Sequence, residues 1–237
     1  MQRYFAKGKM DNHFILVDDD LYHIKTVMRM KDNDLIEVVY ENRLFHCCIE
    51  NVKSNIKIII KKEIKNIKNN VPKVTLIIPL LKENKMDLIL QKATEMGVYK
   101  FIVLPFNRCV IKALEKKKNN RIDRWKRIVK EASEQSKRVD IPEIEFKDKL
   151  TDLKKLDDIC LTCSTKEKQK NLKRVLTKNK NCDRINLVIG PEGGLTNEEE
   201  DYLDSIGFQR ISLGNQILRV ETVPLFLMSI IDYEYME

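Results

Sequence analysis

The amino-acid sequence predicts an α/β fold with a largely parallel sheet, preceded by a small unit that is rich in strands. From residue 72 onward, buried apolar runs alternate with amphipathic helical stretches, the order expected of strands joined by crossover helices. Residues 1–71 instead hold short runs of alternating polarity. Because a Lys- and Asn-rich stretch ending at Pro72 separates the two parts, we expect domains at residues 1–71 and 72–237.

In the first domain the sequence predicts one helix and three strands. The helix is expected over residues 20–30, with Asp18 to Asp20 supplying caps and negative charge at its N-terminus. Residues 34–40 and 43–52 read as strands, and only Glu41 and Asn42 separate them, which favours a β-hairpin. A third strand is expected over residues 55–64.

In the second domain, strands and helices are expected to alternate. The spacing of apolar residues predicts, in order, a strand at 74–81, a helix at 85–97, a strand at 100–105, a basic helix at 121–138, a strand at 158–164 and a Lys-rich helix at about 166–176. Two further strands, around 187–189 and 211–213, each end in a glycine. Pro224 suits the first turn of a C-terminal helix.

The two glycine-ended strands predict a ligand-binding edge. Gly190, Gly193 and Gly194 let the backbone turn sharply and approach a bound molecule closely, while Pro191 stiffens the turn. In an open parallel sheet, ligands bind beyond the carboxyl ends of the strands. Thr196 and Glu199 form a capping box, so a helix is expected over 197–206, with Gly207 as its stop. The glycines fit neither the dinucleotide fingerprint nor a phosphate loop, which favours a ligand other than NAD or ATP.

The amino-acid sequences of both loops resemble the motifs of a known family. GPEGGLTNEEED (190–201) and SLGNQILRVET (212–222) are similar to the paired signatures of the ribosomal RNA small subunit methyltransferase E family, bacterial enzymes that methylate N3 of a uridine in 16S rRNA. QKATEMGV (91–98), RWKRIVKEASEQSKRVDIP (124–142) and the stretch HIKTVMRMKDND (23–34) also resemble it. The resemblance implies a trefoil-knotted SPOUT methyltransferase domain after a PUA-like β-barrel, with S-adenosylmethionine as cofactor, and a homodimer.

The resemblance also assigns site residues. S-adenosylmethionine is expected to lie against the two glycine loops, an apolar wall and a third loop after the strand at 158–164, which together involve Thr162, Gly190, Pro191, Glu192, Gly193, Gly194, Leu213, Gly214, Ile217, Leu218 and Thr222. Uracil N3 is a poor nucleophile until its proton leaves. We therefore expect Arg219 to stabilise the resulting negative charge, and Glu221 or Glu192 to orient groups or accept the proton. The larger Val223 replaces a small residue of the family pattern and could tighten the pocket.

The charge distribution favours an anionic partner. Residues 112–138 contain eleven Lys or Arg and four Asp or Glu, a net charge of +7, whereas residues 183–237 carry three against eleven, a net charge of −8. So uneven a distribution points to RNA over part of the surface. The expected RNA contacts are Arg3, Arg29, Lys117, Lys118, Arg121 and Arg138, and the expected partner is 16S rRNA within the 30S subunit, a role in ribosome biogenesis.

Composition limits the remaining choices. No secretory signal or membrane-spanning apolar run is recognised, so a soluble, cytoplasmic protein is expected. Six cysteines in 237 residues fit free thiols, and the C-x-x-C of Cys160 and Cys163 lacks the second pair that a zinc site needs, so no metal is expected. In a strand, these two thiols would point to opposite faces.

Three alternatives remain open at this stage. A related knotted methyltransferase could act on ribose 2′-hydroxyls of transfer RNA, although that group typically carries SLN where this chain has SLGNQILR. A nucleotide-binding oxidoreductase would need a phosphate fingerprint. A non-catalytic RNA-binding module fits the basic helix but leaves the two polar glycine loops without a purpose.

Overall fold

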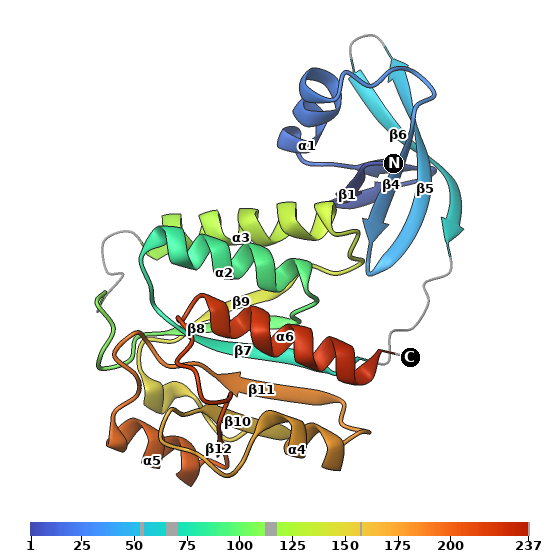
Figure 1. Cartoon of the computed structure of the whole chain (residues 1–237). Coiled ribbons are helices and arrows are strands. Elements are labelled where there is room, and N and C mark those ends of the chain that lie inside the picture. The colour runs from blue at the N-terminus through green and yellow to red at the C-terminus, as the bar shows by residue number, and fades with distance from the viewer. Residues whose placement is uncertain (53–54, 65–70, 112–117, 157, 237) are drawn as a thin grey trace. The chain divides into compact units, whose positions relative to one another are not determined.

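The computed structural model describes residues 1–52, 55–64, 71–111, 118–156 and 158–236. The chain forms two compact units, one made of Met1–Asn69 with Ser133–Ile141, the other of Asn70–Ala132 with Pro142–Glu237. Figure 1 traces the chain through both. The domain boundary expected between residues 71 and 72 stays a prediction.

The first unit is built on a six-stranded sheet. Its strands are β1 (Arg3–Phe5), β2 (Gly8–Met10), β3 (His13–Ile15), β4 (Leu35–Tyr40), β5 (Arg43–Val52) and β6 (Asn55–Ile64), in the order β1-β4-β5-β6-β3-β2. The predicted hairpin of β4 and β5 is confirmed, with Glu41 and Asn42 both at positive φ as a two-residue turn of this kind requires. Strands β1 to β3 escaped prediction because three residues are too few to show a period of two.

The helix expected over residues 20–30 is wrong in its bounds and its type. It begins as α1 (Asp18–Tyr22) and continues as a π-helix, η1 (His23–Val27). Val17 is the N-cap and makes no side-chain cap bond, so the three aspartates lie in the first turn rather than at the cap. Asn33, in the turn before β4, has a left-handed backbone, a conformation that asparagine tolerates better than most residues.

The second unit contains a six-stranded sheet in which every recorded strand pair is parallel, as predicted. Its strands are β7 (Lys73–Pro79), β8 (Lys100–Leu104), β9 (Glu143–Phe146), β10 (Ile159–Cys163), β11 (Arg184–Val188) and β12 (Gln209–Ile211), in the order β12-β10-β11-β7-β8-β9. The edge strand β9 was not predicted, because its sequence EIEF is half charged and offers only four residues.

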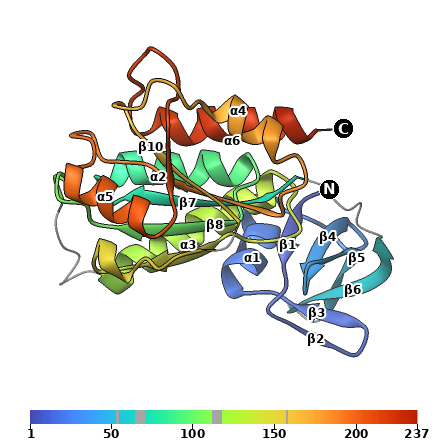
Figure 2. The same ribbon diagram turned by 90° about the horizontal axis from the view of Figure 1, so that it is seen from below.

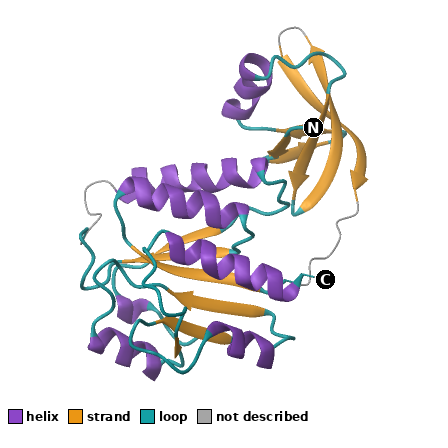
Figure 3. Cartoon of the chain, in the orientation of Figure 1, coloured by secondary structure: helices purple, strands orange, loops and turns teal. Residues whose placement is uncertain are grey.

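Helices cover both faces of this sheet. They are α2 (Glu83–Glu95), α3 (Lys118–Gln135), α4 (Leu172–Lys178), α5 (Asn197–Ser205) and α6 (Thr222–Tyr235). Residues of α2, α3, α4 and α6 share one apolar core with the sheet, whereas α5 packs on the other face. Figure 2 shows α2, α4 and α6 on one side and α5 on the other, and Figure 3 distinguishes the helices from the strands by colour.

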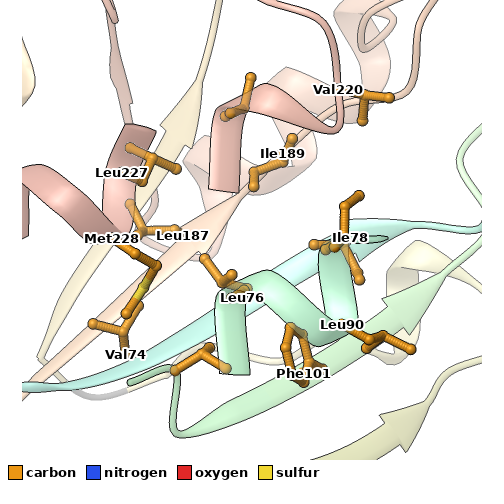
Figure 4. Packing of buried hydrophobic residues seen from close by; sticks show 14 of the residues in the cluster. Val74, Leu76, Ile78, Leu90, Phe101, Leu187, Ile189, Val220, Leu227 and Met228 are labelled. Carbon is orange, nitrogen blue, oxygen red and sulfur yellow. The ribbon is translucent and has the colours of Figure 1, made fainter. Parts of the chain in front are cut away.

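The central strands are buried on both faces, which explains their uninterrupted apolar runs. Val74, Leu76 and Ile78 of β7 face the larger core, where they meet Leu227 and Met228 of α6, while Ile77 faces the α5 side. Figure 4 shows Val74, Leu76, Ile78, Leu227 and Met228 within the larger core.

The Lys-rich helix expected at about 166–176 begins later, at Leu172. Asn171 is its N-cap, and its side-chain oxygen accepts a hydrogen bond from the Arg174 amide at 3.0 Å. Residues before it form a loop in which the Glu167 carboxylate accepts bonds from the Gln169 and Lys170 amides. Lysines that looked like a helical face therefore lie in a loop beyond the end of β10.

Candidate functional site

A pocket of about 730 Å³ lies in the second unit, where β10, β11 and β12 end. The strand order places these three ends beside one another, because β10 lies between β11 and β12. The loop after each strand contributes to the wall, and the start of α2 and the segment after β8 add one residue each. The lining residues are Lys85, Arg108, 163–166, Lys168, 189–195, Glu200, 212–221 and Val223.

The first glycine loop, residues 190–195, is packed too closely for larger side chains. A Cβ on Gly190 would lie 3.1 Å from Leu195 Cγ and 3.3 Å from the Leu195 amide nitrogen. A Cβ on Gly193 would lie 3.0 Å from Arg108 Cβ. Gly194 has φ near +72°, and its amide donates to the Pro191 carbonyl at 2.8 Å, closing a turn.

The start of α5 fixes the far end of this loop. Thr196 and Glu199 form the predicted capping box, since each side chain accepts from the other residue's amide, at 3.2 and 2.8 Å. The Glu199 carboxylate also accepts a 2.6 Å bond from the Asn107 amide, in the segment after β8. The predicted helix is confirmed, and Gly207 follows it at positive φ.

The second loop, residues 212–221, supplies the apolar wall and a cation. Ile217 is 86% exposed at the pocket although it is a large apolar side chain. Leu218 is half-buried, and the side chain of Arg219 is exposed. The Arg219 carbonyl accepts bonds from the Thr222 and Val223 amides, so it is the backbone of Arg219 that starts α6.

Lys85, on the first turn of α2, joins the two loops. Its ammonium nitrogen lies 3.2 Å from Glu192 Oε1 and 3.1 Å from Glu221 Oε2. These hydrogen bonds, to Glu221 first and Glu192 second, raise the pKa of Lys85. The pKa of Glu221 is held below its ordinary value by its own backbone amide and by Lys85, against the opposing effect of partial burial. The Glu221 carboxylate is therefore kept ionised, and Lys85 orients both carboxylates at the pocket.

We expect Lys85→Gln to raise the pKa of Glu221 at the pocket without unfolding the protein. Glutamine keeps a hydrogen-bond donor but leaves two carboxylates without their shared cation, so the pKa of Glu221 rises. Since a depressed pKa keeps a carboxylate ionised to lower pH, losing Lys85 moves the acid limb of the pH–rate profile to higher pH. Lys85→Arg is the charge-conserving control, and coincident acid limbs for all three proteins would contradict the pairing.

Of the eleven residues expected to hold the cofactor, nine line the pocket. They are Gly190, Pro191, Glu192, Gly193, Gly194, Leu213, Gly214, Ile217 and Leu218. Thr162 is fully buried within β10, and Thr222 is the first residue of α6; neither is among the lining residues. At the end of β10 it is Cys163, Ser164 and Thr165 that reach the pocket. Both proposed catalytic residues, Arg219 and Glu221, also line it.

Two residues expected to contact RNA are engaged within the first unit. Arg3 is 7% exposed; it pairs with Glu37 at 3.0 Å and donates to the carbonyls of Lys137 and Arg138. Arg138 forms an ion pair with Asp140 at 2.7 Å, and its side chain is 10% exposed. Their guanidinium groups tie this unit together, which leaves little of either available to RNA.

The other expected RNA contacts are placed differently. Arg29 is exposed, in a left-handed turn just after η1. Arg121, on α3, lies 3.6 Å from Glu83. Lys117 lies outside the described residues, and Lys118 is the first residue of α3. The RNA contacts expected at these residues stay a prediction.

Several pocket residues were missed by sequence reasoning. They are Lys85, Arg108, Ser164, Lys166, Lys168 and Glu200. A signal did exist for Lys85 and Arg108, because each follows shortly after a predicted strand, and all parallel strands end at the same edge. For Glu200, one of three consecutive glutamates in 198–200, the sequence offered no signal that separates it from its neighbours.

The cysteines make no disulfide in the described chain, where all six are free thiols. Cys160 lies in the core on the α5 side, whereas Cys163 packs against the opposite core, as the strand spacing predicts. Burial raises the pKa of the Cys163 thiol to about 12, so it stays protonated. Within the described ranges, no three His, Cys, Asp or Glu side chains come together as a metal site requires.

Comparison with known proteins shows which family models and which relatives the chain matches. Residues 67–232 match the model of an RNA methyltransferase domain, and residues 16–63 match that of an RNA methyltransferase PUA domain. The chain is 31% identical to ribosomal RNA small subunit methyltransferase E of Bacillus subtilis, over 99% of this chain and 97% of that protein. It is 34% identical to the protein of the same name from Mesomycoplasma hyopneumoniae, over 97% and 98%.

A solved structure agrees with these relatives. Ribosomal RNA small subunit methyltransferase E from Neisseria gonorrhoeae, bound to S-adenosyl methionine, superposes with a TM-score of 0.85 at 25% identity, covering 99% of this chain and 98% of that one. Separately, none of the helices in the described part of the chain has the length and apolar character needed to cross a lipid bilayer.

Proposed function

The chain belongs to the ribosomal RNA small subunit methyltransferase E family, and on that premise we propose that it transfers a methyl group to N3 of a uridine in 16S rRNA. It is an RNA methyltransferase that uses S-adenosylmethionine. The observation that carries the finer proposal is the pocket itself, which combines a close-packed glycine loop, an apolar wall, an exposed arginine and two carboxylates that pair with Lys85.

The residues of the pocket fit the methyl donor. Gly190 and Gly193 keep the first loop thin, since a Cβ on either would meet Leu195 or Arg108. Ile217 and Leu218 offer an apolar surface for an adenine ring, in a pocket of the size usual for small ligands. The bound donor supplies an electrophilic methyl group on a sulfonium, and the Glu221 carboxylate at the pocket favours that positive charge.

The acceptor requires two things of the protein. The N3 proton of uracil must leave, and the negative charge then spreads onto the flanking carbonyl oxygens. The exposed guanidinium of Arg219 lines the same pocket as Glu221 and can stabilise that charge, while Glu221 or Glu192 orients or accepts the proton. The remaining contribution is positioning, because methyl transfer is an in-line displacement that needs near-attack geometry.

Cations at the pocket fit an RNA strand. Arg108 is exposed and donates to the Gly193 carbonyl at 2.8 Å, which holds its guanidinium over the first glycine loop. Lys168 and Arg219 line the pocket as well. In this proposal Arg108 binds a phosphate near the target nucleotide, and the exposed Arg29 of the PUA-like unit contributes a second RNA contact.

We expect Arg108→Gln to raise the KM for RNA about tenfold while leaving the affinity for S-adenosylmethionine within about twofold. Glutamine keeps the aliphatic stem and a donor for the Gly193 carbonyl but loses the charge. The salt dependence of RNA binding should become shallower by about one unit in log–log slope. Arg184→Gln, at the exposed first residue of β11 and at the opposite end of that strand from the pocket, is the charge-matched control. An unaltered KM and slope would remove Arg108 from the RNA contact.

Further features belong to the same proposal. The family resemblance supports a trefoil knot around the cofactor pocket, a homodimer, action on the 30S subunit and a cytoplasmic location. Dimerisation is measured by light scattering of the purified protein. The preferred substrate is identified by offering free 16S rRNA and assembled subunits in parallel.

The test of the function is to map methylated nucleosides by mass spectrometry after incubating the purified protein with S-adenosylmethionine and 30S subunits that lack the modification. New 3-methyluridine at one position would support donor, acceptor atom and substrate together. A methylated ribose would indicate the 2′-hydroxyl chemistry of the sister group. Binding of RNA without any methylation would favour a non-catalytic module.

A further inference from the structure

We infer that Glu200 is a positioning residue, which holds the loop after β10 against α5 and thereby sets the affinity of the pocket for S-adenosylmethionine. We call residues 164–170 the third loop. The inference rests on the proposed function of the pocket, and it assigns a role to a residue of α5 that is only 2% exposed yet contributes to the pocket wall.

The Glu200 carboxylate bonds to one hydroxyl group and to two cationic side chains. Its Oε1 accepts a 2.7 Å hydrogen bond from the Ser164 hydroxyl, the first residue of the third loop. Its Oε2 lies 2.8 Å from Lys166 Nζ, also in that loop, and 3.0 Å from an Arg210 nitrogen in β12. One buried carboxylate therefore connects α5, the third loop and β12.

The third loop has one backbone anchor at its start, because the Ser164 amide donates to the Ile211 carbonyl of β12 at 3.0 Å. Its other ties there are made by side chains. The Lys166 amide donates to the Ser164 hydroxyl at 3.2 Å, and Lys166 Nζ reaches the Asn197 side chain at 2.8 Å. At its far end the Lys170 carbonyl accepts a 2.7 Å bond from the Ser212 amide, which ties it to the second glycine loop. Between these ends, Thr165, Lys166 and Lys168 line the pocket. Loss of Glu200 would free the Ser164 hydroxyl and the Lys166 ammonium near the first end, and would leave the backbone bonds at both ends in place.

Burial makes this contact strong and costly to break. A carboxylate that is 2% exposed needs cations and donors around it, and Lys166, Arg210 and Ser164 supply them. The neighbouring Glu199 is equally buried but is used in the capping box and by the Asn107 amide. Of these two carboxylates, only Glu200 is directed to the loop and the pocket.

Asp201 offers a matched control. Its carboxylate pairs with Arg210 at 2.7 Å, as that of Glu200 does, but it is 72% exposed and is not among the pocket-lining residues. Glu200→Gln and Asp201→Asn each neutralise one carboxylate on α5 and each remove one partner of Arg210. They differ in the contacts to Ser164 and Lys166.

The experiment measures the Kd of S-adenosylmethionine by calorimetry for the wild type, Glu200→Gln, Asp201→Asn, Lys166→Met and the double variant Glu200→Gln/Lys166→Met. We expect Glu200→Gln to raise Kd about tenfold or more and Asp201→Asn to change it less than about twofold. Because Glu200 acts through the loop, Lys166→Met should also weaken binding, and the double variant should be weaker by less than the product of the two single effects.

Hydrogen exchange of the cofactor-free proteins gives a second readout. Amides of residues 164–170 should exchange faster in Glu200→Gln than in the wild type or Asp201→Asn, while those of β7 and β11 stay unchanged. Faster exchange throughout the second unit would show that Glu200 only stabilises the fold and would overturn the inference. So would an unchanged Kd in Glu200→Gln. A wild type that binds no S-adenosylmethionine would count instead against the proposed function.

Discussion

Arg219→Ala is expected to lower kcat by about 10²–10³-fold while the Kd of S-adenosylmethionine changes little. The side chain is exposed at the pocket, whereas the backbone carbonyl makes the bonds to Thr222 and Val223 that start α6. Alanine removes the guanidinium and keeps those backbone bonds, so the fold of the second loop should persist. The loss should therefore fall on the step in which the uracil oxygens carry negative charge.

The controls for this prediction separate charge from position. Arg219→Lys keeps a cation without the planar donor fork and should retain part of the activity. Arg184→Ala removes an exposed arginine at the first residue of β11, at the opposite end of that strand from the pocket, and should behave as wild type. Single-turnover rates with saturating RNA measure the chemical step directly. An Arg219→Ala rate equal to wild type would remove Arg219 from the mechanism.

Gly190→Val should abolish measurable binding of S-adenosylmethionine, raising its Kd by about 100-fold or more. The first carbon of the new side chain would already lie 3.1 Å from Leu195 Cγ and 3.3 Å from the Leu195 amide. The second contact is with backbone, so a change of rotamer cannot relieve it. The loop between β11 and α5 must open instead, which displaces Glu192 and Gly193 from the pocket.

Gly194→Asn is the comparison within the same loop. No atom lies within 4 Å of a Cβ placed there among the described residues, but φ is near +72°, a conformation that asparagine tolerates better than most residues. We expect a loss of stability of about 1 kcal/mol from the backbone term, and a smaller loss of affinity than in Gly190→Val. Thermal denaturation and calorimetry measure the two effects. Equal affinities for Gly190→Val and wild type would show that the loop adapts to the added volume.

Basic patterning did not show which arginine side chains are already paired within the protein. Arg3 and Arg138 carry the charge that an RNA contact needs, yet their guanidinium groups pair with Glu37 and Asp140 and with backbone carbonyls. Composition gives the number of charged residues but not the ion pairs that they form in the folded protein. The exposed Arg108, which lies outside the basic segment 112–138, was overlooked for the same reason.

The sequence by itself determined the alternation of strands and helices, the hairpin at Glu41 and Asn42, the capping box of α5 and the two glycine loops. These features depend on local patterns: apolar periodicity, turn residues with positive φ, and short-range caps. The family resemblance added the cofactor and the reaction. Short strands and the edge strand β9 carried too few residues to be recognised.

Only the tertiary structure decided which residues share the pocket. Lys85 lies more than a hundred residues before Glu192 and Glu221 along the chain, and it meets both because β7 and β11 are neighbours in a parallel sheet whose strands end at one edge. Glu200 differs from Glu198 and Glu199 only in the direction in which the helix turns it, which is toward the third loop. The sequence specifies the helices and strands. The order of the strands in the sheet and the direction in which each helix turns its side chains decide which residues meet at the pocket.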